Sequence, residues 1–223
     1  MSLQDRIRRY AKLRFMIFYP LVVYLVFRSS PSERSLLPAA VFLAAGVLLR
    51  LWSNGYAIKM GKLTTSGPYA FIRNPLYLGT MFIALGVVVL LREYWLGILF
   101  AVVMAVVYRR TIMQEEKMLE ERFGADYLNY KKCVPGLWPR PTPYMKGEKW
   151  PFSWQRIRES REHKIVLWVI ITVIAFELKK DLIVDKTPFG VQQAWMTAGL
   201  LLLAAADISI ECFKARFVKK VVA

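Results

Sequence analysis

Cysteine and histidine are scarce in this chain, which has 223 residues but only two cysteines and one histidine. Cys133 and Cys212 stand alone in the sequence, with neither a Cys-x-x-Cys pair nor a histidine cluster beside them. The sequence therefore indicates neither a zinc site nor a disulfide framework, and we expect no metal site. The single histidine, His163, lies far from the polar motifs described below, so those motifs contain no obvious general base.

Acidic residues are also few, because 16 Asp and Glu stand against 32 Lys and Arg and give a formal net charge of +16. In a soluble protein such an excess would suggest nucleic acid as a partner. Here 56% of the residues are hydrophobic, and they gather in runs with the charges between them. We therefore expect anionic membrane lipid, and no nucleic acid, to face the basic residues.

The apolar runs predict an all-α polytopic membrane bundle of about six transmembrane helices. The expected spans are residues 13–27, 36–52, 75–91, 94–108, 165–178 and 190–210. No small-residue cleavage site follows the first run, which therefore predicts an anchor rather than a signal peptide. No Pro or Gly interrupts the sequence after the fourth run until Gly124, so that helix is expected to continue out of the bilayer.

We interpret residues 1–223 as a single membrane domain with three parts. Residues 1–35 hold a basic amphipathic segment and the first span, residues 36–140 form a core, and residues 141–223 hold a polar connector and two spans. With six spans and both ends on one side, 25 Lys and Arg lie on that side and six on the other. This bias predicts that the ends of the chain, the loop before residue 75 and the segment after residue 108 face the cytoplasm.

A polar, aromatic loop precedes the third span. Gly67-Pro68 is a turn signal, and Pro75 suits the first turn of a helix because proline lacks a backbone N–H. Between and after them lie Tyr69, Arg73, Asn74 and Tyr77.

A pair of acids, Glu115 and Glu116, lies where the fourth span leaves the bilayer. Because a tight reversal at Arg92-Glu93 joins the third and fourth spans, we expect the loop and the acids to lie side by side. Arg offers a planar donor fork to a carboxylate, and Glu accepts from ribose hydroxyls or an ammonium group. Aromatic faces can stack on a base or attract a cation.

The segment GPYAFIRNPLYLG, followed after about forty residues by EEKMLEERFGADYLNYKKCVPGLWP, resembles the integral-membrane methyltransferases. That family includes isoprenylcysteine carboxyl methyltransferases and phospholipid N-methyltransferases. Its pattern is a Gly-x-Tyr turn, then Arg-His-Pro-x-Tyr-x-Gly, then a Glu-Glu pair followed by Phe-Gly, two tyrosines and Val-Pro. The resemblance covers roughly residues 40–140, so it makes 36–140 a methyltransferase-like core.

The resemblance implies S-adenosylmethionine as methyl donor, with S-adenosylhomocysteine as product, bound at the cytoplasmic membrane face. It also implies a lipophilic small-molecule or lipid acceptor that enters from the bilayer. The residues it assigns to cofactor binding are Tyr69, Arg73, Asn74, Pro75, Tyr77, Gly79, Glu115 and Glu116. We expect Arg73 and Glu116 to be catalytic as well, Arg73 by orienting a carboxylate of the cofactor or the acceptor.

Two positions depart from the family pattern. Asn74 replaces the usual His, so it keeps a hydrogen-bonding side chain but cannot carry a proton charge near neutral pH. Gly136 replaces an Arg that often follows Val-Pro, and the nearby Arg140 is not assigned that role. With no obvious base in this region, an acceptor that is already nucleophilic is favoured, such as an isoprenylcysteine-like carboxylate.

Several alternatives stay open from the sequence alone. The acceptor could instead be a phospholipid amine or a small thiol, or the chain could be a non-catalytic scaffold or transporter. Arg73 and, more readily, Arg50 could be arginines that extend to the lipid headgroups. Glu115 and Glu116 could lie on a solvated helix face, and Tyr127 and Tyr130 could be headgroup anchors.

Overall fold

The computed structural model describes residues 24, 28–58, 61–160 and 162–222. Within these ranges the chain is all-helical, with no β-strand, which confirms the predicted fold class. The expected first span, 13–27, lies outside the described residues apart from Tyr24. Among the residues described, three helices are long and apolar enough to cross a membrane: Glu33–Tyr56, Gly97–Cys133 and Val191–Ser209.

Helix α2 (Glu33–Tyr56) and helix α3 (Pro75–Leu91) form the centre of the bundle. Pro75 is the first helical residue of α3, as the sequence predicts, and Asn74 is the N-cap. With 17 residues α3 is about 26 Å long, slightly less than the hydrocarbon thickness. It ends at Arg92, whose left-handed φ of 59° makes the expected reversal into α4.

Helix α4 (Tyr94–Cys133) leaves the apolar layer as one long helix, as predicted, but it does not end at Gly124. Gly124 has φ 51° and ψ −123°, a conformation open essentially to glycine, and the chain kinks there. The helix then resumes to Cys133. Residues 125–133, after the kink, are therefore helical as well.

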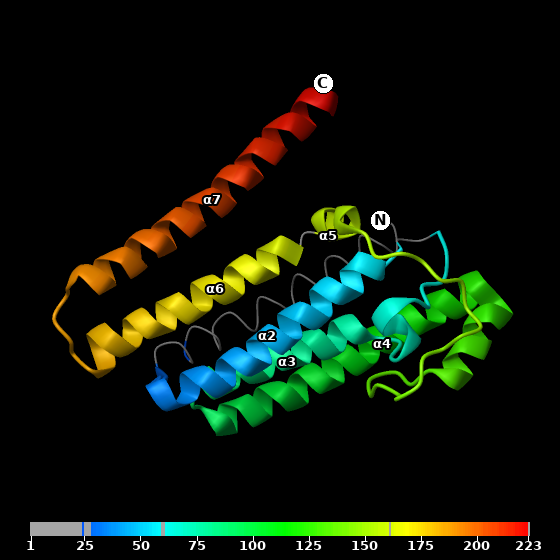
Figure 1. The fold of residues 1–223 in the computed structure, drawn as a ribbon, viewed down its shortest axis with the longest axis horizontal. Helices are drawn as coiled ribbons and strands as arrows, with labels where there is room; N and C mark the ends of the chain where they lie inside the picture. The colour runs from blue at the N-terminus through cyan, green and yellow to red at the C-terminus, as the bar shows by residue number, and fades with distance from the viewer. Residues whose placement is uncertain (1–23, 25–27, 59–60, 161, 223) are drawn as a thin grey trace.

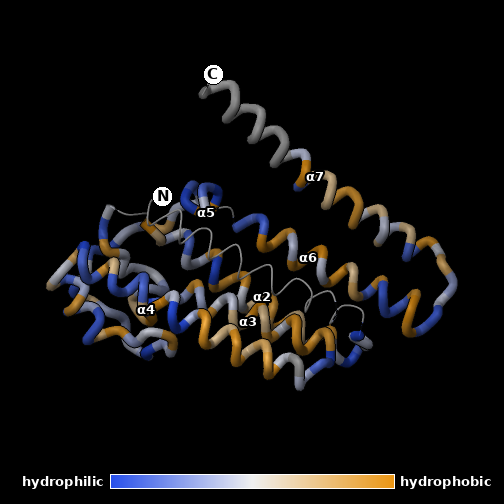
Figure 2. The backbone as a smooth tube through the Cα atoms, turned by 180° about the vertical axis from the view of Figure 1, so that it is seen from behind, coloured by the Kyte–Doolittle hydropathy of each residue, from blue (hydrophilic) through white to orange (hydrophobic). Residues whose placement is uncertain are grey.

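The rest of the described chain adds α5 (Trp154–Ser160), α6 (Glu162–Lys179), a π-helical turn η2 (Lys180–Val184) and α7 (Val191–Val222). Figure 1 shows α2, α3 and α4 side by side, with α6 along α2 and α7 diverging from α6. Helix α6 matches the predicted fifth span, although Glu, His and Lys occupy its first turn. Hydrophobic residues follow the middle of these helices, and hydrophilic ones gather at the end where α4 kinks (Figure 2).

Close contact between α2 and α3 depends on glycine. A Cβ atom at Gly46 would lie 2.6 Å from the carbonyl oxygen of Gly79, and one at Gly79 would lie 2.6 Å from Cγ of Arg50. Small residues at such positions let two helix backbones approach, which is how helices pack in a membrane. At the far end of the bundle, Leu90 and Leu91 pack with Phe176 of α6. The bundle therefore holds the start of α3 firmly against α2.

Candidate active site

The loop before α3 is built by its glycine and its prolines. Gly67 has φ 59°, and it opens a short 3-10 helix η1 (Gly67–Ala70) that carries Tyr69. A Cβ atom at Gly67 would collide with the ring of Tyr56 at 2.3 Å, so both the conformation and the space demand glycine. Tyr69 and Arg73 therefore lie on a backbone of fixed conformation just before the N-terminus of α3.

The ends of α3 and α4 meet at this loop, as the sequence predicts. The hydroxyl of Tyr77 donates a hydrogen bond to Oε1 of Glu115 at 2.8 Å. Nη1 of Arg73 lies 3.1 Å from Oε1 of Glu116, and both side chains are largely buried, at 13% and 14% exposed. The interpretation of these acids as a solvated helix face is therefore wrong.

The second oxygen of Glu116 is also paired. Lys131, which follows the Gly124 kink, places Nζ 3.2 Å from Oε2 of Glu116 and also contacts Glu120. One carboxylate therefore lies between two cations, Arg73 and Lys131. The kink of α4 at Gly124 brings Lys131 back to Glu116, a contact that a straight α4 could not form.

Tyrosines line the inside of the loop. Burial raises the pKa of Tyr69 above its usual value, so its hydroxyl stays protonated at neutral pH. The hydroxyl of Tyr130 donates a 2.6 Å hydrogen bond to the backbone oxygen of Tyr69. Tyr127 and Tyr130 are 1% and 2% exposed, so they pack inside the protein and are not headgroup anchors.

The segment after α4 fastens the loop through backbone hydrogen bonds. The N–H of Arg73 donates to the oxygen of Pro135 at 2.9 Å, and the N–H of Asn74 donates to that of Gly136 at 3.2 Å. The side-chain amide of Asn74 donates to the same Gly136 oxygen at 3.1 Å. Asn74 therefore has a direct structural partner, and Gly136, the other departure from the family pattern, lies against it.

Further contacts extend this support. The N–H of Tyr144 donates to the oxygen of Ala70, and the hydroxyls of Thr65 and Ser66 both donate to the oxygen of Glu148. Sequence reasoning missed this role of residues 135–148, because backbone hydrogen bonds require no particular side chain. The only signal available was the Val-Pro-Gly turn that reverses the chain after α4.

Two predicted positions behave differently from the rest. Gly79 lies at the contact with α2, against Gly46 and Arg50, so its observed neighbours are helix backbone and an arginine stem. Arg50 does not extend to the headgroups: it is 15% exposed and forms a buried ion pair with Glu162 of α6 at 2.7 Å. The headgroup interpretation of Arg50 is therefore wrong, and neither Arg50 nor Glu162 was predicted as part of the site.

The residues present fit a ligand that carries a carboxylate. Nε and Nη1 of Arg73 are buried without a hydrogen-bond partner, since the contact of Nη1 with Glu116 is an ion pair without hydrogen-bond geometry. A buried donor without a partner costs about 1–3 kcal/mol, which a bound carboxylate oxygen would recover. Beside it, Glu115 and Glu116 offer acceptors for ammonium or hydroxyl groups, and Tyr69 and Tyr77 offer aromatic rings.

An apolar groove of about 520 Å³ lies between α3 and α4 and runs towards this cluster. At one end it is lined by Tyr108 and Trp138, and its walls are side chains such as Phe82 and Met104. The ring of Tyr108 packs edge-on against Tyr77 with centroids 5.0 Å apart. A lipid chain in the groove would therefore reach the site beside the Tyr77–Glu115 hydrogen bond.

A larger cavity of about 670 Å³ lies on the other side of the kinked part of α4. Lys62, Lys132, Tyr144 and Cys133 are among its lining residues, whereas Arg73, Glu115 and Glu116 are not. The predicted site residues thus converge on one another rather than on this cavity.

These features define an integral-membrane helical protein with a polar site built where two helix ends meet beside an apolar groove. The comparisons with known proteins show which proteins the chain is similar to. Residues 36–126 match the phospholipid methyltransferase family, which confirms the predicted resemblance to the integral-membrane methyltransferases. This matched region includes every predicted site residue.

Relatives of known name agree with that match. The chain is 39% identical over 88 residues to protein-S-isoprenylcysteine O-methyltransferase of Mus musculus, an alignment that covers 39% of this chain and 29% of the mouse protein. It is 38% identical over 73 residues to the Schizosaccharomyces pombe protein of the same name, covering 33% of this chain and 31% of the other. The alignments thus span less than a third of these relatives.

A different relative is aligned over more of its length. The cobalt-zinc-cadmium resistance protein CzcN of Cupriavidus metallidurans is 29% identical over 135 residues, which cover 59% of this chain and 62% of that protein. No solved structure matches the chain.

Proposed function

We propose that the chain transfers the methyl group of S-adenosylmethionine to a lipophilic acceptor at the cytoplasmic face of the membrane. The observation that carries this proposal is the junction of the Arg73 loop with the Glu115–Glu116 segment of α4 at the end of an apolar groove. The family match and the methyltransferase relatives support the reaction class. An isoprenylcysteine-like carboxylate is the acceptor that we favour.

When bound, S-adenosylmethionine would supply a methyl group on a sulfonium: the acceptor's lone pair would form a bond to the methyl carbon while the carbon–sulfur bond breaks in line and its electron pair stays on sulfur, so that S-adenosylhomocysteine leaves. The contribution of the protein to such a reaction is positioning and exclusion of water. Arg73 would hold a carboxylate through Nε and Nη1, which are buried and make no hydrogen bond. Glu116, held by Arg73 and Lys131, and Glu115, held by Tyr77, would accept hydrogen bonds from the polar groups of the cofactor.

A carboxylate acceptor suits the residues around the groove. It is ionised at neutral pH and therefore needs no general base, whereas an amine must first lose a proton. His163, the single histidine of the chain, is exposed at the start of α6. The groove between α3 and α4 has the apolar walls that an isoprenoid or acyl chain requires. Phospholipid amines and small thiols remain the alternative acceptors.

A non-catalytic role is the second candidate, and the resistance protein among the relatives is the observation that favours it. Within the described residues, no group of three or more His, Cys, Asp or Glu is placed to hold a metal ion. A role in metal resistance would therefore have to come from something other than a site of that kind in this part of the chain.

Calorimetric titration of S-adenosylhomocysteine into the detergent-solubilised protein tests the proposal. We expect a dissociation constant of roughly micromolar size, near −8 kcal/mol. The Arg73→Ala variant should bind at least about tenfold more weakly because it loses a charge-assisted contact. Arg110→Ala is the matched control, since Arg110 is an exposed arginine of α4 and this variant should bind like the parent.

The acceptor is identified separately. Membranes that contain the protein are incubated with radiolabelled S-adenosylmethionine and a panel of prenylcysteines, aminolipids and thiols. Label in a base-labile prenylcysteine ester supports the favoured acceptor, and label in an aminolipid or a thiol selects an alternative. An absence of S-adenosylhomocysteine binding at high ligand concentration would instead support the scaffold.

A further inference from the structure

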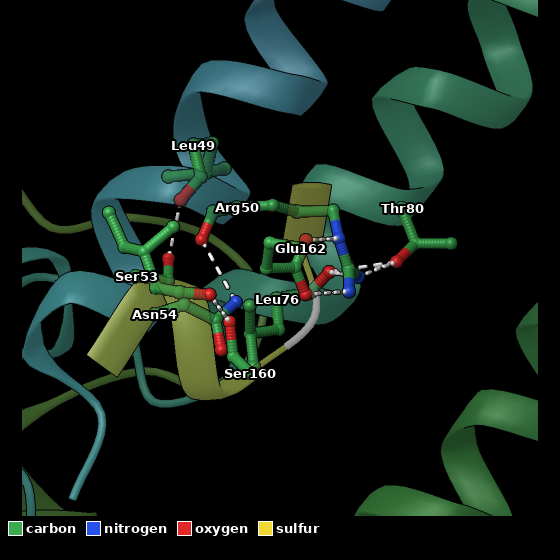
Figure 3. A network of polar contacts seen from close by, with 9 residues as sticks. Leu49, Arg50, Ser53, Asn54, Leu76, Thr80, Ser160 and Glu162 are labelled. Atoms are coloured by element: carbon green, nitrogen blue, oxygen red, sulfur yellow. Dashed lines mark hydrogen bonds and ion pairs between the residues drawn. The ribbon is translucent and has the colours of Figure 1, made fainter. Parts of the chain in front are cut away.

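A buried ion pair joins the C-terminal part of the chain to the core of the bundle. Nε and Nη2 of Arg50 in α2 donate to the two carboxylate oxygens of Glu162 at 3.0 and 2.7 Å, a bidentate arrangement shown in Figure 3. Glu162 is the first residue of α6 and is 6% exposed. It lies 112 positions after Arg50 and outside the region 36–126 that matches the family.

Arg50 uses its third nitrogen, Nη1, on the first turns of α3. Nη1 donates to the backbone oxygen of Leu76 at 3.1 Å and to the hydroxyl of Thr80 at 2.6 Å (Figure 3). Leu76 lies between Pro75 and Tyr77, both predicted site residues. The guanidinium group therefore holds Glu162 on one side and the start of α3 on the other.

The contacts continue from Thr80 to the acidic segment of α4. The hydroxyl of Thr80 donates to the backbone oxygen of Leu76 at 2.9 Å, and Leu76 directly precedes Tyr77, whose ring packs edge-on against Tyr108. Tyr77 in turn donates to Glu115 at 2.8 Å. An unbroken series of contacts thus leads from Glu162 through Arg50 to the site.

Stability alone gives a weak account of this arrangement. A buried ion pair gains little over apolar packing of the same shape, because desolvation of both charges offsets their attraction. What a fully satisfied bidentate pair does provide is fixed geometry. Arg50 and Glu162 also lie close enough to Tyr69 to act electrostatically on its hydroxyl.

We propose that Glu162 is a positioning residue of the site, supplied by the C-terminal part of the chain and acting through Arg50. By fixing the Arg50 guanidinium, Glu162 sets the orientation of the first turns of α3 and so the placement of Tyr77 and Glu115. The inference rests on the proposed function, because the site positioned is the one assigned to the methyl donor. It also gives α6 a role, because this helix completes the site from outside the matched region.

The test compares Glu162→Gln with Glu159→Gln in the full-length, detergent-solubilised protein. Glu159 lies three residues earlier, is exposed and bonds only locally to Gln155, so it controls for the loss of one negative charge. Two quantities are measured for each protein: the dissociation constant for S-adenosylhomocysteine, and amide hydrogen exchange in residues 69–80 without ligand. Thermal unfolding is followed in parallel.

We expect Glu162→Gln to bind S-adenosylhomocysteine roughly 10- to 100-fold more weakly, since it loses a charge-assisted bidentate contact. Exchange should rise in residues 69–80 and stay unchanged in residues 191–209 of α7. Glu159→Gln should match the parent in both measurements. Parent-like binding by Glu162→Gln overturns the inference, and so does faster exchange spread over all helices with unchanged affinity of the folded fraction.

Glu162→Asp keeps the test decisive if Glu162→Gln does not fold. The aspartate side chain is one methylene shorter than that of glutamate. It keeps the negative charge but draws the Arg50 guanidinium away from Thr80. Folded protein with weakened binding supports positioning, whereas parent-like affinity and exchange overturn it. If the parent itself does not bind S-adenosylhomocysteine, the proposed function fails, and the exchange measurement alone decides whether Glu162 positions residues 69–80.

Discussion

The hydroxyl of Tyr77 is the one polar group that links α3 directly to the acidic part of α4 within the described site. Its 2.8 Å bond to Glu115 has a charged acceptor in partly buried surroundings, where such bonds are stronger than between neutral groups. The Tyr77 ring also contacts Tyr108 at the end of the groove. Removal of this single oxygen should therefore alter the packing at the end of the groove as well as the position of Glu115 in the site.

Tyr77→Phe removes that oxygen and keeps the ring. We expect the free energy of unfolding to fall by about 1–3 kcal/mol, because Glu115 loses its donor while it stays partly buried. Thermal unfolding in detergent measures the loss, and calorimetry should show weaker S-adenosylhomocysteine binding. Tyr94→Phe is the control, because Tyr94 is 56% exposed at the start of α4. Equal melting temperatures for both variants would contradict the role given to this bond.

At the residue scale, the sequence predicted contacts that follow from adjacency and missed those that do not. Arg73 and Glu116 could be placed side by side from the motif and the tight turn between the third and fourth spans. Arg50 could not be paired with Glu162, because arginines near span ends are common and nothing in one sequence selects a partner 112 residues away. From the sequence, Asn74 is interpreted only as the replacement of a titratable histidine. Its hydrogen bond to the backbone oxygen of Gly136 shows that it also has a structural role.

At the scale of helices, the contact between α2 and α3 fixes where the site loop sits. Gly46 faces the backbone of α3 with no room for a side chain, since a Cβ atom would lie 2.6 Å from the Gly79 oxygen and 2.8 Å from the Ile83 nitrogen. Those atoms belong to backbone and cannot rotate away. The two helices must therefore separate if anything larger than hydrogen is placed there.

Gly46→Ala tests this packing. We expect the free energy of unfolding to fall by about 1–3 kcal/mol, as for other overpacked contacts, with a lower melting temperature in detergent. Gly199→Ala in α7 is the matched control. No atom lies within 4 Å of its added methyl, so alanine there should be neutral or stabilise by up to about 1 kcal/mol. A melting temperature of Gly46→Ala equal to that of the parent would contradict this prediction, because α2 and α3 would then separate without loss of stability.

Helix boundaries could be predicted where proline or a reversal marks them. Helix α3 begins at Pro75 and ends before Arg92, as expected. The kink of α4 was not foreseen, because the absence of Pro and Gly predicts a continuous helix only as far as Gly124 and gives no geometry for the residues after it. The supporting role of residues 135–148 was also missed, since it depends on backbone groups that any residue carries.

On the scale of the whole molecule, the basic residues predict that the site faces the cytoplasm. The site and Cys133 lie at the end of the bundle where α4 kinks, while Ser30 lies before α2 at the opposite end. Both Cys133 and Ser30 are exposed. Their labelling from the two sides of a sealed membrane therefore reports orientation.

We expect a membrane-impermeant maleimide to label Cys133 of a Cys212→Ser protein only in vesicles with the cytoplasmic face outward. A Ser30→Cys variant that also carries Cys133→Ser and Cys212→Ser should be labelled only in the opposite vesicles. The reverse pattern would contradict the cytoplasmic placement of the site. Mass spectrometry of the labelled peptides identifies which cysteine reacted.

The reversal at Arg92 joins α3 and α4 at the end of the bundle far from the site. Glu115 lies 21 residues after Tyr94 in α4, so it is about 32 Å along the helix axis from the reversal. A tilt of about 5° between the two helices would shift Glu115 by roughly 3 Å, as much as the whole length of its bond to Tyr77. A molecule that enters between the two helices within the bilayer and tilts them slightly would therefore displace Glu115, at the water-facing end, by enough to break its bond to Tyr77.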